Sequence, residues 1–530
     1  MPGLGPLPYD EAVTLNDFLP DLHSATCRLE AVEAAATVPG RRALVDVLAA
    51  QSVPRGPRAL ASLDRLAQPG TVAVVTGQQA GLFGGPLLTT YKLLSAVAVA
   101  RALEAETGHA AVPVFWLQNE DHDFVEIAQT WVPGRIGLVP LTVPDVPDLA
   151  RCSVAHRLLY EAIVPLLETL RAELGGFDGA AEVQALLERA YRPGRAISAA
   201  FAELVATLFE PWGVVLVDSR EPGLAALAAP FHARALRATF TLSGGLLARS
   251  EALAAAGLTP QVHVRPGAPL AFFHPDGPEG PRYRLEPLAS GRYALVGGPA
   301  ATFTEAELLA RLEAEPRSVS SSALLRPLIQ DQLLPTAAYV GGPAERMYFA
   351  QLDPLYAWAG RAMPLVVPRA RFSVLEERTV RLLDMLGLAA DDVTTPRDVL
   401  RARLADRDVT GPTPEALTDA LLSAFRTALA EHVPAIRTLD ATLDGPLQKL
   451  DDSVQESVSR FTQKLARARL AQDTLQSDRL DRLLALLQPN GVPQERVHGL
   501  PYYLARYPRF LEVVLDAVEP YSGALRELRP

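Results

Sequence analysis

The stretch that decides the fold is Thr71–Lys92, which reads TVAVVTGQQAGLFGGPLLTTYK. It begins with an apolar, β-branched run, continues through a glycine-rich segment, and takes on helical periodicity from Leu87. A second apolar run, VPVFWL, follows the predicted helix at residues 112–117. Strand, helix and strand in succession are the order of a parallel βαβ unit. The sequence therefore predicts an α/β protein with a Rossmann-like, doubly wound parallel sheet.

Helical patterns and short apolar runs continue to alternate along the chain. Further strands are expected at 213–218, 336–340 and 364–367, and helices at 155–210 and 223–257. Between residues 261 and 298 the short runs VHV, LAFF, RYRL and RYALV are separated by Gly and Pro, which predicts a small antiparallel insertion. Thr304 and Glu307 have the spacing of a capping box that opens the next helix.

The C-terminal third has the pattern of long helices, near 374–388, 415–437 and 446–487. In the last of these, apolar residues step by three or four between charged ones, which is typical of a coiled coil. Such a helix must bury its seam against a companion helix or a second chain, and we expect both. We predict a core over 1–370, with a helical insertion at about 150–210 and the β insertion at about 258–300. An α-helical coiled-coil domain is expected over 371–489, and a tail over 490–530 is expected to pack back on the core.

Charge and cysteine content exclude several classes of function. The 530 residues include 50 basic and 61 acidic side chains, a formal net charge of −11 without a basic stripe, which argues against a nucleic-acid partner. Cys27 and Cys152 form no CxxC or CxxH motif, so neither a zinc site nor a disulfide is expected. The uncharged stretch 66–91 is broken by Gly and Pro, and no signal peptide is legible at the start of the sequence. We expect a cytoplasmic protein without a membrane span.

The glycine-rich turn after the first strand is the first candidate site. In open α/β sheets, ligands bind at the carboxyl ends of strands, where free N–H groups and the helix dipole attract anions. Gly77 and Gly81 would let a ligand approach, and Gln78 and Gln79 need polar partners. Thr90 and Lys92 follow on the predicted helix, and Lys92 is one of only three lysines in the chain. The alternative is that the glycines serve backbone geometry alone.

The second candidate site follows the second strand, in the run Gln118–Asp123. On an extended backbone Glu120 and His122 share one face, and Asp121 and Asp123 the other. One carboxylate could orient His122 as a general base or as a contact for a substrate amine. The alternative is a solvated loop in which Asp121 or Asp123 caps a helix. The interpretation as a metal site has weaker support, because no second His or Cys lies nearby at the spacing of metal ligands.

A third group of polar residues surrounds the Gly-Gly-Pro triplet at 341–343. Arg326 and Gln330 lie four residues apart, so on a helix they share a face and can both reach a carboxylate or phosphate. The other members of this group are Asp331, Gly341, Gly342 and Glu345. The alternative is a buried ion pair between Arg326 and Asp331 or Glu345.

Four blocks of the sequence closely resemble the bacillithiol biosynthesis cysteine-adding enzymes: residues 76–92, 112–124, 324–345 and 489–507. The resemblance implies a Rossmann-like core related to class I aminoacyl-tRNA synthetases and an antiparallel coiled coil that forms a homodimer. It also implies the last step of bacillithiol synthesis, in which L-cysteine is joined to glucosaminyl-malate. By position, the turn from Gly77 to Gln79 stands where those synthetases keep their nucleotide-binding signature, although its two histidines and a lysine-rich second signature are absent here.

Amide formation sets chemical requirements that assign roles to these residues. Cysteine's carboxyl must be activated, most simply by ATP, which becomes ADP or AMP; a requirement for Mg²⁺ stays open. We expect the Gly77–Gly81 turn and Lys92 to hold phosphate, and Glu120, His122 and Asp123 to bind or deprotonate the amine. Gln330, Asp331 and Glu345 would bind ammonium or sugar hydroxyls. Two other functions remain. One is a nucleotide-binding coiled-coil scaffold without turnover. The other is a glycosyltransferase-like enzyme, for whose Asp-x-Asp metal motif at a strand end Asp121-His122-Asp123 is the only near miss.

Overall fold

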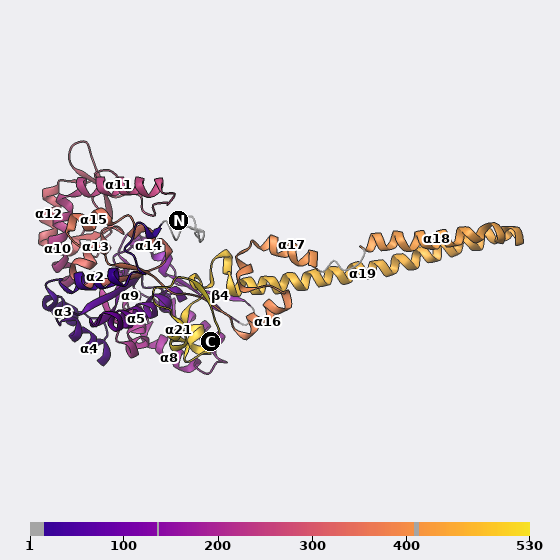
Figure 1. The fold of residues 1–530 in the computed structure, drawn as a ribbon, viewed down its shortest axis with the longest axis horizontal. Helices are drawn as coiled ribbons and strands as arrows, with labels where there is room; N and C mark the ends of the chain where they lie inside the picture. The colour runs from indigo at the N-terminus through magenta and orange to yellow at the C-terminus, as the bar shows by residue number, and fades with distance from the viewer. Residues whose placement is uncertain (1–14, 135–136, 408–412) are drawn as a thin grey trace. The chain divides into compact units, whose positions relative to one another are not determined.

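The computed structural model describes residues 15–134, 137–407 and 413–530. The chain forms two compact units (Figure 1). The first contains the chain up to Ser373 together with Glu495–Pro530, and the second contains Val374–Gln494. The chain therefore leaves the first unit once and returns to it near the C-terminus.

The first unit is built on a five-stranded sheet in the order β12-β11-β1-β2-β5. All four neighbouring pairs run parallel; Val75 of β1, for example, lies opposite Val114 of β2 and Tyr339 of β11. The predicted parallel sheet is therefore confirmed. Its strands are β1 (Val72–Gln78), β2 (Ala111–Leu117), β5 (Val215–Asp218), β11 (Thr336–Gly341) and β12 (Leu365–Pro368).

Helices cover both faces of this sheet. Alternate residues of a strand point to opposite faces, so Ala73 and Val75 enter one core while Val72 and Val74 enter another. Each fully buried Val or Leu contributes about 1.5–3 kcal/mol relative to an exposed one. The second core is closed by α2 (Ala25–Ala36) and α5 (Leu87–Thr107). The first core is closed by α3 (Arg41–Ala50), α4 (Pro57–Leu66), α10 (Pro222–Arg237), α11 (Thr239–Ala255), α13 (Arg326–Leu333), α14 (Pro343–Phe349) and α15 (Asp353–Ala359).

Two insertions interrupt the alternation of strands and helices. The first begins with α6 (Phe124–Ile127) and the hairpin of β3 (Gln129–Pro133) and β4 (Leu138–Thr142), and continues with α7 (Ile163–Leu174), α8 (Ala180–Ala190) and α9 (Ile197–Leu208). The second is an antiparallel sheet in the order β10-β6-β7-β8-β9. It contains β6 (Ala271–Phe273), β7 (Tyr283–Pro287), β8 (Tyr293–Leu295), β9 (Thr302–Phe303) and β10 (Val319–Ser321), with α12 (Glu305–Ala314) between the last two strands.

The β insertion differs from the sequence prediction in two respects. The run VHV at 262–264 is not a strand, and Val264 packs into the core of the main sheet. The insertion also extends beyond residue 300, since its edge strand β10 follows α12. The capping box at the start of α12 is confirmed: the Glu307 N–H donates to the Thr304 hydroxyl, and Glu307 accepts from the Thr304 N–H at 2.7 Å.

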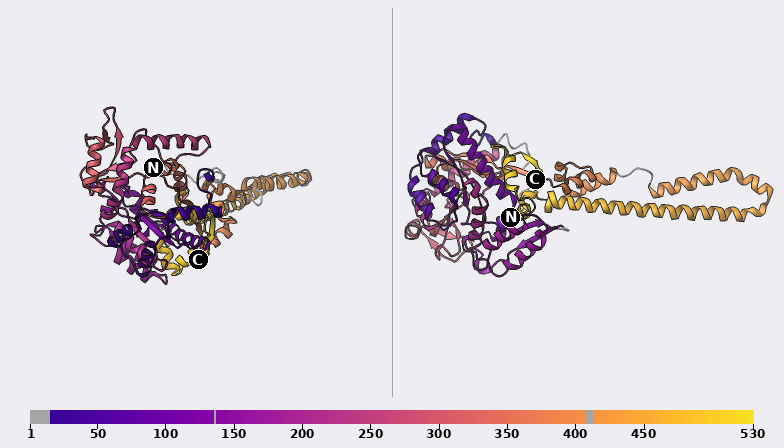
Figure 2. Two further views of the ribbon diagram at one scale, coloured as in Figure 1. Left: turned by 60° about the vertical axis from the view of Figure 1, so that its left-hand side comes forward. Right: turned by 90° about the horizontal axis from the view of Figure 1, so that it is seen from below.

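The described part of the second unit contains four α-helices, of which two form a long antiparallel pair (Figure 2). They are α16 (Glu377–Leu386), α17 (Arg397–Arg407), α18 (Pro414–Leu439) and α19 (Asp444–Leu487). An ion pair of 3.0 Å between Arg426 and Asp451 joins α18 to α19. The coiled coil predicted from the sequence is confirmed, whereas α17 was not predicted. Leu450, Phe461 and Leu475 of α19 remain 45–55% exposed.

The tail of the first unit contains α20 (Leu500–Arg506), α21 (Phe510–Ala517) and β14 (Leu525–Leu528), the last of which forms a two-stranded sheet with β13 (Arg371–Val374). It approaches the start of α5, where the Leu87 N–H donates to the carbonyl oxygen of His498 at 2.9 Å. Glu495 forms a buried, two-bond ion pair with Arg369, which follows β12. The tail is therefore part of the edge of the sheet at which the strands end.

Candidate active site

The carboxyl ends of β1 and β11 mark the topological switch point of the sheet. From β1 the chain proceeds to β2 and β5 on one side, and β11 and β12 lie on the other side. Ligands of open α/β sheets bind in the crevice outside the strand ends at such a point. Polar residues predicted from the sequence follow β1, β2 and β11, so the topology brings these residues to one edge. Arg326, Gln330 and Asp331 of the third group instead lie on α13, before β11.

The turns after β1 and β2 are joined by a cluster of four side chains. Gln79 Nε2 donates a hydrogen bond of 2.8 Å to Asp121 Oδ2. Arg282, which immediately precedes β7 of the β insertion, donates from Nη2 to Asp121 Oδ1 and from Nε to His122 Nδ1 at 3.1 Å. The Arg282 guanidinium also lies 4.2 Å from the ring centroid of Phe272. Gln79, Asp121, His122 and Arg282, hereafter the strand-end cluster, therefore connect three segments that are distant in the sequence.

Charge in the strand-end cluster favours an ionised Asp121. Burial opposes ionisation, but the hydrogen bond from His122 and the charge of Arg282 outweigh it and hold the pKa of Asp121 well below its usual range. His122 Nδ1 lies 3.1 Å from Arg282 Nε and 3.3 Å from Asp121 Oδ1, so it can accept from Arg282 or, when it carries the ring proton, donate to Asp121. In the tautomer that accepts from Arg282, the ring proton is on Nε2, and His122 presents an N–H donor at that atom.

The backbone after β2 is not extended, so the predicted alternation of faces is wrong. Residues 119 and 120 form a turn, and Asp121 and His122 both contact Arg282. Asp123 is exposed and caps α6, where its carboxylate accepts from the Glu126 N–H at 3.3 Å. Of the two interpretations of Asp123, the structure supports the helix cap and places its side chain outside the strand-end cluster.

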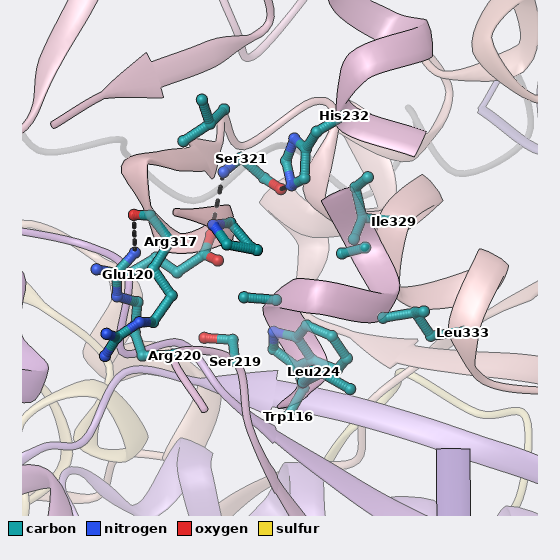
Figure 3. Close-up of a pocket in the computed structure, with 14 residues that line it drawn as sticks. Trp116, Glu120, Ser219, Arg220, Leu224, His232, Arg317, Ser321, Ile329 and Leu333 are labelled. Atoms are coloured by element: carbon teal, nitrogen blue, oxygen red, sulfur yellow. Dashed lines mark hydrogen bonds between the residues drawn. The ribbon is translucent and has the colours of Figure 1, made fainter. Parts of the chain in front are cut away.

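Glu120, next to Asp121 in the chain, lines a small pocket between β2, β5 and the β insertion (Figure 3). Its carboxylate accepts from the Ser321 N–H at 3.2 Å, and Arg220 beside it donates to the carbonyl oxygen of Arg317. Burial raises the pKa of Glu120, whereas the charges of Arg220 and Arg282 oppose that rise. The remaining wall is mainly apolar and includes Trp116, Leu224, Ile329 and Leu333, together with His232. The pocket thus combines a carboxylate and guanidinium groups with an apolar wall.

The glycine-rich turn is closed by protein atoms. The Gly84 N–H contacts the Tyr191 hydroxyl at 3.2 Å, and the Leu87 N–H at the start of α5 donates to His498. The N–H groups of Gly81 and Gly85 bond within the turn. A Cβ atom on Gly81 would lie 2.7 Å from the Cα of Gly85, so glycine is needed here for packing. The N–H groups of Gly81, Gly84, Gly85 and Leu87 are therefore not free, contrary to the prediction.

Lys92 is buried, and its ammonium is fully bonded. Its Nζ donates at 2.9 Å to both the Gly77 carbonyl and Gln78 Oε1, and it forms an ion pair with Glu345. An ammonium has three donors, so a phosphate could be added only if one of these contacts were lost. Burial lowers the pKa of Lys92, and the negative charge of Glu345 opposes that effect. In turn, the positive charge of Lys92 lowers the pKa of Glu345, although burial alone would raise it. Lys92 therefore fixes the end of β1, and the neighbouring Thr90 is buried in the same helix.

The third group of predicted residues forms a buried network around β11. Glu345 accepts from the Tyr339 hydroxyl at 2.7 Å and from the Gly342 N–H at 2.8 Å. Next to it, Arg326 donates to the hydroxyls of Tyr348 and Tyr339. A Cβ on Gly341 would come within 2.9 Å of the Glu345 side chain, so this glycine permits the close approach.

The network continues away from the strand ends. Arg326 donates to Gln330 at 3.1 Å, and Gln330 donates to Asp331 at 3.0 Å. The expectation that Arg326 and Gln330 share a face is confirmed, but they bond to each other. Arg326 forms neither of the alternative ion pairs, with Asp331 or with Glu345. Its guanidinium donates instead to two tyrosine hydroxyls and to Gln330. Gln330 and Asp331 are buried and do not reach the strand-end cluster.

Of the two cysteines, Cys152 lies beside the strand-end cluster, since its backbone pairs with Pro281, the residue before Arg282. Burial raises the pKa of both Cys27 and Cys152, so both are neutral thiols. Within residues 15–134, 137–407 and 413–530, no three His, Cys, Asp or Glu side chains are placed to hold a metal ion. In the same ranges, the helices are too short or too polar to cross a membrane.

The sheet and the polar groups at its carboxyl edge define a Rossmann-like protein with a candidate reaction site at the strand ends. The sequence profile of the bacillithiol biosynthesis BshC N-terminal Rossmann-like domain matches residues 15–370, and that of the BshC C-terminal coiled-coil domain matches residues 372–526. The chain belongs to the BshC family of bacillithiol biosynthesis proteins.

Individual relatives agree with this assignment. A protein of Solibacter usitatus is 35% identical over 517 residues, covering 93% of this chain and 91% of its own. A protein of Salinibacter ruber is 34% identical over 517 residues, covering 96% of this chain and 92% of its own. Both carry the name "Putative cysteine ligase BshC". Among solved structures, a Thermus thermophilus arginyl-tRNA synthetase covers 86% of each chain at 13% identity with a TM-score of 0.17, which is too low to support an argument.

Proposed function

We propose that this protein is a cysteine ligase that joins the carboxyl group of L-cysteine to the amine of glucosaminyl-malate, the last step of bacillithiol biosynthesis. Family membership and the names of its relatives support the reaction class. The observation that carries the proposal is the hydrogen bond between Gln79 and Asp121, because it unites the polar turns after β1 and β2 in one cluster at the edge where such folds bind ligands.

The reaction needs an activated carboxyl group, and we propose ATP as the co-substrate on this chemical ground. A carboxylate oxygen of cysteine attacks a phosphorus atom of ATP, which releases pyrophosphate or ADP and leaves an acyl adenylate or acyl phosphate. The glucosamine nitrogen then attacks the carbonyl carbon, AMP or phosphate departs, and the nitrogen loses a proton. Mg²⁺ would accompany the nucleotide. We assign no phosphate contact to Lys92 or to the N–H groups of Gly81, Gly84 and Gly85, because these groups are bonded within the protein.

The geometry suggests distinct roles for the acidic and histidine side chains. Ionised Asp121, held by Arg282, is suited to bind the substrate ammonium before the amine is deprotonated. Glu120 is suited to accept the proton, since a raised pKa makes a carboxylate a better base. His122, whose Nδ1 is occupied by Arg282, is suited to donate from Nε2 to the oxygen that gains charge as the amide forms.

A direct assay separates this proposal from a nucleotide-binding scaffold. Full-length protein is incubated with L-cysteine, glucosaminyl-malate, ATP and Mg²⁺, and the products are measured by mass spectrometry. The ligase produces bacillithiol and one AMP or ADP per amide. ATP binding without amide formation in this mixture would favour the scaffold and overturn the ligase. A glycosyltransferase-like reaction would instead require a sugar nucleotide as donor.

We also propose that the protein is a cytoplasmic homodimer. Cysteine and ATP are cytoplasmic metabolites, and α19 carries apolar side chains that its partner helix α18 leaves exposed, among them Leu450, Phe461 and Leu475. A second copy of the unit would bury them.

A further inference from the structure

A second cavity lies at the opposite edge of the main sheet from the strand-end cluster. Its volume is about 220 Å³. Thr336, the first residue of β11, and Pro364, which precedes β12, lie on its wall, together with the C-terminal half of α2 and the loop that follows α15. The cavity is therefore at the amino ends of β11 and β12, away from the edge of the sheet at which we propose that the reaction takes place.

Two opposite charges line this cavity. The Arg361 side chain is half-buried, and within the described ranges its guanidinium has no hydrogen-bond or ion-pair partner. Asp331 is 3% exposed, and its carboxylate accepts from Gln330 at 3.0 Å and from the Tyr356 hydroxyl. A carboxylate can accept about four hydrogen bonds, so Asp331 keeps capacity for another donor. Burial raises the pKa of Asp331, and the hydrogen bonds from Tyr356 and Gln330 and the charge of Arg361 oppose that rise. Asp331 and Arg361 attract each other, and no direct ion pair joins the two side chains.

The rest of the wall is mostly apolar and made of small side chains. It is contributed by Ala31, Ala34, Ala35, Val38, Pro39, Ala362, Met363 and Pro364. Pockets of this kind bury the apolar body of a small ligand, and a few polar groups fix its orientation. A cation and an anion on such an apolar wall match a ligand in which an ammonium group, a carboxylate group and an apolar side chain are attached to the same carbon.

We propose that this cavity binds a small free α-amino acid with an apolar side chain, with its carboxylate on Arg361 and its ammonium on Asp331. The guanidinium offers two parallel donors to a carboxylate, which gives both strength and orientation. Asp331 is fixed by Gln330 and Tyr356, so its position does not depend on the ligand. This site is distinct from the one at which we propose that cysteine reacts.

Isothermal titration calorimetry of the full-length protein with L-leucine tests the proposal. Leucine is expected to bind saturably, and 4-methylpentanoate and 3-methylbutylamine, which lack its ammonium and its carboxylate respectively, are expected to bind at least about tenfold more weakly. Arg361→Gln should weaken leucine binding by at least about tenfold. Arg42→Gln, which removes an 82% exposed guanidinium from α3, should bind leucine as the wild type does.

A second variant keeps the test informative if Arg361→Gln alters folding. Ala34 is exposed at the rim of the cavity on α2, and Ala34→Met would narrow the opening while preserving a good helix former. It is expected to weaken leucine binding without lowering the thermal unfolding temperature. The proposal is overturned if wild type shows no saturable leucine binding, if 4-methylpentanoate binds as tightly as leucine, or if both variants bind like the wild type. The readout is leucine binding, so failure of ligase activity would not affect it.

Discussion

The side-chain amide of Gln79 donates to the carboxylate of Asp121 at 2.8 Å, and this one contact links the turn after β1 to the turn after β2. The other end of the same amide, Gln79 Oε1, is buried and has no partner in the described part of the chain. A buried acceptor without a partner costs about 1–3 kcal/mol, so a substrate N–H or O–H that reached it would be favoured. We therefore expect Gln79 to serve both the cluster and the substrate.

Replacing Asp121 with asparagine should disable the strand-end cluster while preserving its shape. Asparagine can still accept from Arg282, but the cluster loses its anion, and Arg282, which is 5% exposed, loses its counter-charge. We expect kcat/KM for bacillithiol formation to fall by about 100-fold, a magnitude typical of a misplaced reacting group. Asp123→Asn is the matched control, because asparagine caps helices as well as aspartate does. Equal activity of the two variants would contradict the assignment.

The buried pair of Lys92 and Glu345 should behave as a coupled unit in stability measurements. Their side chains are only 4% and 17% exposed, and removing one partner leaves the other charge buried. Lys92→Met is expected to lower the free energy of unfolding by about 3–5 kcal/mol. In a double-mutant cycle with Glu345→Gln, urea unfolding should show a coupling energy of at least about 0.5 kcal/mol. If the losses of stability from the two single substitutions simply add in the double variant, the contact between Lys92 and Glu345 does not stabilise the end of β1.

Stability should decrease as the pH falls below about 6.5, because two histidines are buried in the neutral form. Burial lowers the pKa of His232 to about 4 and, with help from Arg220, that of His274 to about 3. The unfolded chain takes up these protons near pH 6.5 and the folded chain does not, so each histidine removes about 2 kcal/mol of stability by pH 5. Urea unfolding of His274→Asn should show a smaller loss between pH 7 and pH 5. The exposed His23→Asn should show the full loss, and identical slopes would refute this cause.

The main sheet was predictable because its signals are local. TVAVVT and VPVFWL are apolar runs bounded by turn residues, and both became buried central strands. Likewise, the polar residues that follow β1, β2 and β11 could be placed at strand ends by topology alone. What the sequence could not provide were partners distant along the chain. Arg282 lies 160 residues from His122, and no local pattern marks it as a site residue.

Long-range contacts also explain the errors at the glycine-rich turn. Free N–H groups were expected there because glycines before a helix often cradle an anion. In the structure Tyr191, 107 residues away, and His498 of the tail occupy those donors instead. Lys92 and Glu345 were each singled out, but only the fold showed that they neutralise one another.

Association of the protein should depend on the exposed apolar side chains of α19. Phe461 is 55% exposed although it lies within the seam predicted from the sequence. Phe461→Glu would place a charge in any interface formed there, so we expect analytical ultracentrifugation to show a monomer where the wild type is a dimer. Arg460→Glu changes an adjacent, 68% exposed position and should leave the dimer intact. A dimeric Phe461→Glu protein, or a monomeric wild type, would contradict the proposed interface.

Neither cysteine should be needed for turnover. Burial raises the pKa of both Cys27 and Cys152, and a neutral thiol is a poor nucleophile. We expect the Cys27→Ser/Cys152→Ser variant to form bacillithiol at a rate within about threefold of the wild type, given the small change in side-chain volume. A folded double variant without activity would instead indicate a covalent enzyme-thiol intermediate.

The most direct test of the account follows oxygen from cysteine labelled with ¹⁸O in its carboxyl group. Wild-type protein, glucosaminyl-malate, ATP and Mg²⁺ are mixed with the labelled cysteine, and the amide product, AMP and phosphate are analysed by mass spectrometry, with Asp121→Asn run in parallel. We predict that each bacillithiol formed leaves one ¹⁸O atom in AMP or phosphate, and that the variant forms far less of both products. Absence of the amide, or amide formed without label in either nucleotide product or phosphate, would contradict ATP-dependent ligation at the strand ends.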